Sequence, residues 1–242
     1  MISYAQNFED VVLNRVFHDV PVGRYIDVGA YDPVLDSVTK HFYDRGWSGV
    51  NVEPVQRFHA KFQRDRYRDW NVNAVLGAAP GEVEFFEWGD SGLSTYRETF
   101  DPQAVARLGF VKTRRTVRMM TLAEIARELE GDEVQFLKID VEGAERDVLL
   151  GGDWRAFRPR VVLLEAIKPK LPGCDIHSYE PTWFEWEDLL LGNGYEFALF
   201  DGLNRFYYRS EEPGLRLPLS YPANITDCFQ LVRGHALSSR AA

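Results

Sequence analysis

The sequence predicts an α/β fold with a doubly wound, mostly parallel sheet that ends in an antiparallel edge hairpin. Short apolar strands alternate with helices along the 242 residues, which is typical of a parallel sheet covered by helices on both faces. The expected strand over residues 160–164 contains the apolar run Val161–Leu164 without alternation, as expected for a strand buried on both faces. Near the C-terminus, the turn Asp201-Gly-Leu-Asn204 separates strands at 195–200 and 204–209, which predicts the hairpin.

The first part of the chain contains strand–helix units in regular order. Phe8, Val11, Val12 and Val16 lie on one side of an expected amphipathic helix. The helix after the first strand should end at Gly46, a residue that favours the left-handed conformation of a helix terminus. The expected elements are a lead-in helix over 1–18, strands over 24–29, 49–53 and 72–76, and helices over 34–46 and 55–66.

The periodicity changes after residue 81. Residues 82–88 alternate between polar and apolar, and the turn-rich stretch Gly89–Ser94 follows. We expect 82–118 to be an insertion over the sheet ends. Thr121 and Glu124 then form a capping box at a helix start. The remaining expected elements are a strand over 134–139, a helix over 142–150, the strand 160–164, a Pro- and Tyr-rich insertion over 168–181, and a helix over 182–191.

Composition indicates one globular domain over residues 1–242, with 1–20 as its lead-in segment. The chain is 45% hydrophobic, which is sufficient for one large core. The net charge of −9 argues against nucleic acid as a partner. The basic stretch Lys112–Arg118 is therefore interpreted as a solvated strand face.

The sequence also predicts a cytoplasmic location. Cys174 and Cys228 have no metal-binding spacing and form no disulfide framework, which favours a reducing compartment. Residues 1–10 are polar and do not resemble a signal peptide. We expect no transmembrane segment, because no run approaches the roughly 20 apolar residues of a membrane span.

Acidic residues follow the expected parallel strands at equivalent positions. Asp27, Glu53, Asp140 and Glu165 each stand at a strand end. A single acid there is often the N-cap of the next helix. Because the carboxyl ends of parallel strands line one crevice, several acids at that position together predict a binding site.

The first strand–helix turn favours a nucleoside without phosphates. It has a single glycine, Gly29, where a dinucleotide fingerprint has three; positions 31 and 34 are Tyr31 and Val34. The acids Asp27 and Asp32 would repel a pyrophosphate. S-adenosylmethionine (SAM) fits better, since it carries a sulfonium, an ammonium and a ribose diol that Glu53 could bind.

Several motifs together resemble the FkbM family of SAM-dependent methyltransferases. The most specific is Lys138-Ile-Asp-Val-Glu-Gly-Ala-Glu145, and the others are Ile26–Ala30, Val52–Pro54 and Ser91–Ser94. Segments Ser3–Asp10 and Asp201–Tyr207 are similar to one branch of that family. The resemblance implies a class I methyltransferase fold with a Rossmann-like seven-stranded sheet. It also implies O-methylation of sugars or other metabolites that carry hydroxyl groups.

The same resemblance implies a set of cofactor-binding residues. Asp27 and Gly29 would shape the turn under the methionine part, Ser37 would meet the SAM carboxylate, and residues 76–78 would lie against adenine. The implied cofactor-binding residues are Asp27, Gly29, Ala30, Asp32, Ser37, Glu53, Pro54, Gly77 and Asp140.

For catalysis, Asp140 is the expected base, because a sugar hydroxyl is a poor nucleophile until it loses its proton. Glu142 and His177 are the alternatives. Asp140, Glu145 and Glu165 could instead hold Mg or Mn, since carboxylate oxygens suit such ions. Residues 91–95 have the composition of a lid.

Two other functions remain open at this stage: an NAD-linked oxidoreductase on a similar sheet, and a non-catalytic binding module. The expected partner is a small-molecule or glycan acceptor. The sequence predicts neither the acceptor's identity, nor the hydroxyl that is methylated, nor the oligomeric state.

Overall fold

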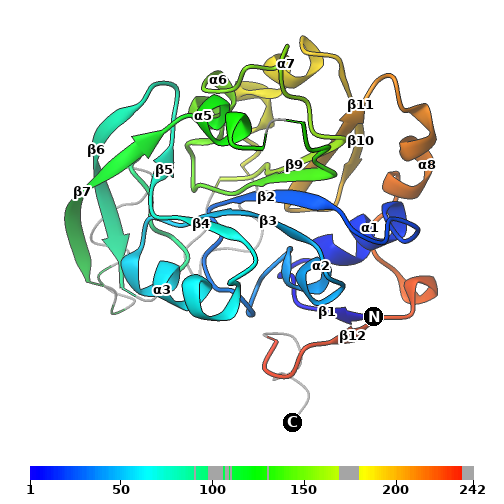
Figure 1. Cartoon of the computed structure of the whole chain (residues 1–242), viewed down its shortest axis with the longest axis horizontal. Coiled ribbons are helices and arrows are strands. Elements are labelled where there is room, and N and C mark those ends of the chain that lie inside the picture. Colours follow the sequence, from blue (N-terminus) through cyan, green and yellow to red (C-terminus); the bar gives the residue numbers. More distant parts are fainter. Residues whose placement is uncertain are drawn as a thin grey trace.

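A computed structural model describes residues 1–89, 91–97, 106, 109, 111–129, 131–168 and 180–235 of the chain. A seven-stranded sheet with the order β10-β11-β9-β8-β2-β3-β4 forms its centre (Figure 1). Strands β9, β8, β2, β3 and β4 are parallel, and β11 is antiparallel to both β9 and β10. The strands are β2 (Arg24–Val28), β3 (Ser48–Val52), β4 (Trp70–Val72), β8 (Phe136–Ile139), β9 (Val161–Glu165), β10 (Tyr195–Phe200) and β11 (Asn204–Arg209). The predicted fold class and edge hairpin are confirmed.

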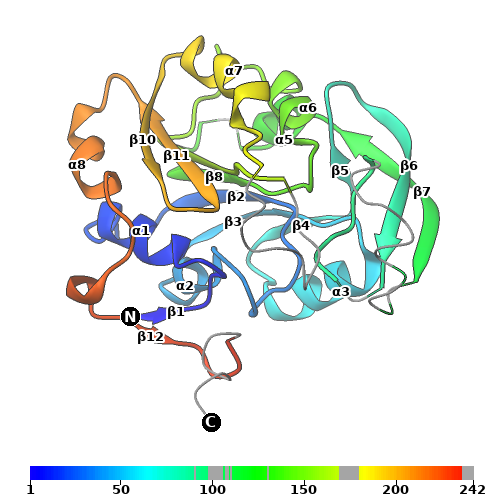
Figure 2. The same cartoon turned by 180° about the vertical axis from the view of Figure 1, so that it is seen from behind.

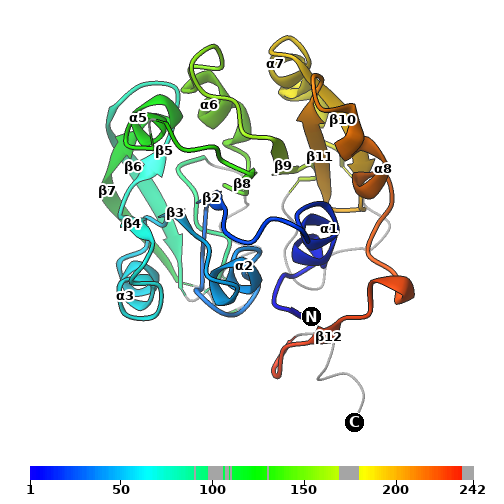
Figure 3. The same ribbon diagram turned by 45° about the vertical axis from the view of Figure 1, so that its right-hand side comes forward.

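Helices cover both faces of this sheet, as Figure 3 shows. The alternation along each strand explains the two layers: Tyr25 points into one core, while Ile26 and Val28 point into the other. One layer contains α1 (Glu9–Val16), α2 (Lys40–Asp44), η2 (Pro213–Leu215) and α8 (Arg216–Leu219). The other contains α5 (Leu122–Arg127), α6 (Glu145–Leu150) and α7 (Glu187–Leu191), which η1 (Trp183–Glu185) precedes. Helix α3 (Gln56–Asp65) connects β3 to β4.

A second sheet of three strands, in the order β5-β7-β6, stands beside the first. It consists of β5 (Val75–Leu76), β6 (Gly81–Trp88) and β7 (Lys112–Met120). The predicted strand 72–76 is therefore wrong as a single element: its start belongs to β4 and its end to β5. Asn73 lies at the break, where its side-chain amide donates to the carbonyl oxygens of Glu53 and Pro54. Most of the basic part of β7 is exposed, as predicted.

Three expected helices are shorter than their sequence patterns indicated. The predicted helix 34–46 contains only α2, because Asp32 Oδ1 accepts the N–H groups of Val34 and Leu35 and so favours a turn. Helix α6 begins at Glu145, since Glu142 and Gly143 have left-handed φ values of 57° and 96°. The expected helix 182–191 is divided into η1 and α7.

The two ends of the described chain meet in a small sheet. Residues Ile2–Ser3 form β1, which pairs in parallel with β12 (Gln230–Leu231), beyond η3 (Ile225–Asp227) (Figure 2). The lead-in helix predicted over 1–18 is therefore restricted to α1, which begins after Phe8 with its φ of 65°. The capping box of Thr121 and Glu124 is confirmed.

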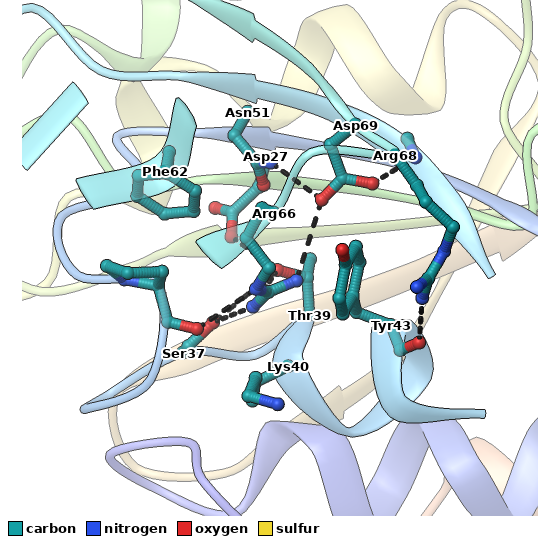
Figure 4. A network of polar contacts seen from close by, with 12 residues as sticks. Asp27, Ser37, Thr39, Lys40, Tyr43, Asn51, Phe62, Arg66, Arg68 and Asp69 are labelled. Carbon is teal, nitrogen blue, oxygen red and sulfur yellow. Dashed lines mark hydrogen bonds and ion pairs between the residues drawn. The ribbon is translucent and has the colours of Figure 1, made fainter. Parts of the chain in front are cut away.

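A buried arginine fixes the connection between β2 and α2 (Figure 4). The side chain of Arg66 is fully buried and lies 3.6 Å from Asp69. Its Nη2 donates to Ser37 Oγ at 2.9 Å, and its Nε donates to the carbonyl oxygen of Pro33 at 3.0 Å. The guanidinium thus attaches a loop without regular structure to the end of α3.

Asp69 extends this network into the sheet. It accepts hydrogen bonds from Tyr25 Oη at 2.7 Å, from Asn51 Nδ2 at 2.9 Å and from the N–H of Gly49 at 2.9 Å. Strands β2 and β3 and the β2–α2 loop are therefore held by one buried ion pair.

Among the described residues, no helix has both the length and the apolar composition that a membrane span requires.

We predict that Arg66→Met lowers the free energy of unfolding by about 3–5 kcal/mol, because Asp69 is then a buried charge without its partner. Urea unfolding followed by circular dichroism measures this change. The matched control is Arg64→Met, at a side chain that is 73% exposed. A loss at Arg66 as small as that at Arg64 would contradict the structural role of the ion pair.

Candidate functional site

A cavity of about 230 Å³ opens at the carboxyl ends of the central strands. The lining includes Val28 at the end of β2, Val52 at the end of β3, and the residues Gly29, Glu53 and Asp140, which directly follow β2, β3 and β8. The acids at the strand ends therefore meet at one edge of the sheet, where an open α/β sheet binds its ligand.

Glu53 is an acid of the cavity that backbone hydrogen bonds hold in place. It is buried, and its two carboxylate oxygens accept the N–H groups of Val55 at 2.7 Å and Tyr31 at 2.8 Å. Burial raises the pKa of Glu53 to about 8, and these two hydrogen bonds oppose the rise. A carboxylate held in this way retains lone pairs that can accept hydroxyl groups of a ligand.

Asp27 does not line the cavity itself, but it pairs with Lys138, which does. The Nζ of Lys138 is 3.3 Å from Asp27 and 3.4 Å from Asp140, and it donates to the carbonyl oxygen of Gly29 at 2.8 Å. Burial raises the pKa of Asp27, and the two carboxylates raise the pKa of Lys138 despite its burial. Lys138 was absent from the predicted site residues, although it stands within the most specific sequence motif.

Gly29 allows the β2 turn to approach the β8 turn closely. Its φ is 77°, and a Cβ at this position would lie 1.8 Å from the carbonyl oxygen of Asp140. Only glycine satisfies both conditions. The result is a bare backbone surface between Glu53 and Asp140.

Three carboxylates gather at the ends of β8 and β9. Asp140, Glu142 and Glu165 each offer an oxygen within 4.8 Å of the others. Burial and the neighbouring acids raise the pKa values of Glu142 and Glu165 well above their ordinary range. Oε2 of Glu142 is inaccessible to solvent and has no hydrogen-bond partner among the described residues.

Glu145 does not belong to this group, although the predicted metal set included it. Its Oε1 accepts the N–H groups of Val141 at 3.2 Å and Gly143 at 3.1 Å. Burial raises its pKa to about 7. The carboxylates that the fold brings together are thus Asp140, Glu142 and Glu165 rather than Asp140, Glu145 and Glu165.

The other end of the cavity is apolar. Val55, Phe58, Val75 and Phe85 form a small core cluster there and also line the cavity. The ring of Tyr31 packs against Phe58 at a centroid distance of 4.6 Å. Such a wall suits the flat face of a nucleobase.

Residues 91–95, which the sequence predicts to be a lid, line the cavity. Thr95 Oγ1 donates to the carbonyl oxygen of Val141 at 3.2 Å. The next residue, Tyr96, donates from its hydroxyl group to the carbonyl oxygen of Leu76 at 3.1 Å. These two hydrogen bonds therefore attach the segment that contains residues 91–95 to both the acidic end and the apolar end of the cavity.

Some predicted cofactor-binding residues do not line the cavity. Ser37 is buried and accepts a hydrogen bond from Arg66. Asp32 binds Lys61 Nζ at 2.7 Å and stabilises its own turn, which lowers its pKa. Ala30 is buried, and the N–H of Gly77 donates to the carbonyl oxygen of Met120.

Of the other predicted residues, Pro54 lines the cavity beside Glu53. His177, and most of the 168–181 insertion with it, lies outside the described residues.

Sequence reasoning missed several lining residues. Tyr31 and Phe58 read as ordinary loop and core aromatics, so no signal marked them. Gln6 and Asp36 also line the cavity. Gln6 stands in the Ser3–Asp10 segment, whose resemblance to one branch of the FkbM family was the available signal.

The arrangement defines an α/β protein with a nucleoside-type cavity at its sheet edge. The family model described as methyltransferase FkbM domain matches residues 27–197. The chain therefore belongs to the FkbM methyltransferase family, as its motifs predicted, and membership implies SAM as the methyl donor. This replaces the NAD-linked alternative.

A similar solved structure is that of methyltransferase FkbM from Methylobacillus flagellatus KT. It has 15% sequence identity and a TM-score of 0.44, over 78% of this chain and 44% of that protein. This chain thus spans less than half of its length. No curated protein matches the chain.

The raised pKa values predict that the ligand-free protein becomes less stable as the pH rises from 6.5 to about 8. In the folded state burial raises the pKa values of Glu9, Glu53 and Glu145 to about 8, 8 and 7, from 4.5. The unfolded chain binds fewer protons in this range, so the free energy of unfolding falls with pH. Burial lowers the pKa of His41 to about 4, so this residue changes the free energy of unfolding only below this pH range.

Urea unfolding at both ends of that pH range measures the slope. Glu53→Gln removes one titrating group and should make the slope shallower, whereas Glu82→Gln, at an exposed strand position, should not. A stability that rises with pH in this window would show that these carboxyl groups are ionised in the fold.

Proposed function

We propose that this chain is a SAM-dependent O-methyltransferase that methylates a hydroxyl group of a sugar or glycan-type acceptor. The observation that carries this proposal is a group of half-buried carboxyl groups: Asp140 and Glu142 line one end of the cavity, and Glu165 lies beside them. Carboxylates at that place can accept the proton that a hydroxyl group loses when it is methylated.

The cavity residues fit the cofactor in three parts. The apolar wall with Val75 and Phe85 suits adenine. Glu53 would accept hydrogen bonds from the ribose hydroxyl groups. Gly29 lines the cavity with backbone atoms alone, and the sulfur and its methyl group would lie beside this turn. The excess of acids at this edge suits a ligand with two positive charges.

SAM supplies a methyl group on a positively charged sulfur and leaves as S-adenosylhomocysteine. The chain has to align the acceptor oxygen with the methyl carbon, since the displacement is in line. As the new C–O bond forms and the C–S bond breaks, the hydroxyl proton passes to a carboxylate. The bond electrons remain on sulfur, so the step balances without another reactant.

We assign the role of base to Asp140. It lines the cavity, its side chain is 34% exposed, and Lys138 compensates its charge. Burial and the neighbouring acids raise the pKa values of Glu142 and Glu165 well above their ordinary range, which makes these two residues less suited to be the base. They can keep the site polar and pass the proton on. His177, proposed as an alternative, lies outside the described residues.

The acceptor would enter over the ends of β8 and β9, below residues 91–95. The acids there fit a neutral polyol better than a phosphorylated sugar, because a phosphate would be repelled. Lys168 and Arg205 already pair with Glu180 and Glu187, at 3.0 Å and 2.6 Å. A saccharide without phosphate is therefore the class of acceptor that we propose.

The carboxylate oxygens of Asp140, Glu142 and Glu165 are of the kind that Mg or Mn takes as ligands. We propose the reaction with Asp140 as a simple base. Exhaustive EDTA treatment during turnover should then leave the rate unchanged. A rate that EDTA abolishes and Mg or Mn restores would assign the carboxylates to a cation instead.

We predict that Asp140→Asn lowers turnover by roughly 10²–10⁴, the usual contribution of a general base. Glu142→Gln should lower turnover less. The assay follows label from methyl-labelled SAM into a panel of unphosphorylated mono- and oligosaccharides. Asp188→Asn, at a carboxylate that is 66% exposed, is the control and should be as active as the wild type.

A larger loss at Glu142 than at Asp140 would move the base role to Glu142. If the wild type binds SAM but methylates no hydroxyl compound, a non-catalytic module of this fold becomes the better account.

A further inference from the structure

One part of the cavity has no role in the proposed reaction. Gln6, from the segment before α1, and Asp36, from the β2–α2 loop, line it together. Neither residue was among the predicted site residues. Gln6 also lies outside residues 27–197, which the family model matches.

Gln6 is presented by a segment that is fixed on both sides of it. On one side, buried Asp10 accepts Ser3 Oγ and the N–H of Tyr4, both at 2.7 Å. On the other side, Glu9 Oε2 accepts the N–H of Asn7 at 2.9 Å. The neighbouring side chains thus hold the backbone, while Gln6 itself is exposed to the cavity.

Distant parts of the chain add to this attachment. Asn204 Nδ2 donates to Glu9 Oε1 at 2.7 Å, across 195 positions of sequence. The ring of His235 stacks on Phe8, and its Nε2 lies 3.1 Å from the carbonyl oxygen of Ala5. The two sequence segments noted for their resemblance, 3–10 and 201–207, therefore meet to position Gln6.

Asp36 presents an exposed carboxyl group to the same place. Its φ is 55°, and it is exposed. Its carboxylate has no hydrogen bond or ion pair with any described residue, whereas its neighbour Ser37 is bound to Arg66. Lys138 is already occupied by Asp27 and Asp140. His235 and Lys138 act on the Asp36 carboxyl group only from beyond ion-pair distance, so an ammonium group of a ligand would be its direct ionic partner.

The strand order indicates which part of the ligand arrives there. The apolar wall and Glu53 lie over β3 and the chain after β4, so they take the adenosine. The acceptor carboxylates lie over β8 and β9. Between them is β2, and the loop that follows β2 carries Asp36. The part of SAM that extends from the sulfur, away from the adenosine, is its amino acid.

We propose that Gln6 and Asp36 bind the amino-acid end of SAM, Asp36 through the ammonium group and the Gln6 amide through the carboxylate. This inference rests on the proposed function, and it transfers to Asp36 and Gln6 the role that was expected of Ser37. An amide N–H donates to a carboxylate and a carboxylate accepts from an ammonium, so both contacts are charge-assisted.

The test compares two ligands that differ in this end alone. S-adenosylhomocysteine carries the amino acid, whereas 5′-methylthioadenosine has the same nucleoside and a thioether sulfur without it. Isothermal titration with the full chain should show that Gln6→Ala and Asp36→Asn each weaken S-adenosylhomocysteine about tenfold or more. Binding of 5′-methylthioadenosine should stay at the wild-type value.

Gln56→Ala and Asp19→Asn, both at exposed positions outside the cavity, are the matched controls and should bind both ligands like the wild type. The melting temperature without ligand identifies any variant that fails to fold. Rescue by Asp36→Glu, which restores the charge, would separate the ionic contact from a purely structural effect.

Equal weakening of both ligands, or no weakening of S-adenosylhomocysteine, would overturn the inference. Equal binding of S-adenosylhomocysteine and 5′-methylthioadenosine by the wild type would also overturn the inference, although SAM would remain the assigned cofactor. A wild type that binds neither ligand would instead refute the proposed function itself.

Discussion

The buried guanidinium of Arg66 is the contact on which the site depends. The loop after β2 has almost no regular structure before α2, yet its residues Gly29, Tyr31 and Asp36 line the cavity. Arg66 binds this loop at Pro33 and Ser37, and its partner Asp69 binds β2 and β3. A loop that must approach a ligand closely is thereby held by charge-assisted hydrogen bonds instead of by helix formation.

Negative charge at the sheet edge is the second constraint. Burial alone would force its carboxyl groups to keep their protons, and the raised pKa values of Glu53, Glu142 and Glu165 show that cost. Lys138 compensates Asp27 and Asp140. A cationic ligand favours ionisation of the other carboxyl groups, whereas a pyrophosphate opposes it, which links the fold's electrostatics to SAM rather than to a dinucleotide.

Patterns with a local physical cause predicted most of the fold and the location of the site. The acids at the strand ends, the hairpin at Asp201–Asn204 and the capping box at Thr121 each follow from neighbouring residues. Side-chain direction could not be predicted: Glu145 turns back to its own loop, while Glu142, with a left-handed φ, joins Asp140. Gln6 reaches the cavity because Asn204 and His235 bind its neighbours Glu9 and Ala5, which no local pattern reveals.

The central claim is that the cavity binds a phosphate-free, positively charged nucleoside. Isothermal titration of the unmodified chain with SAM and, in the same buffer, with NAD tests it most directly. The account predicts saturable binding of SAM with one site per chain and no heat of binding with NAD. Binding of NAD without binding of SAM would contradict it.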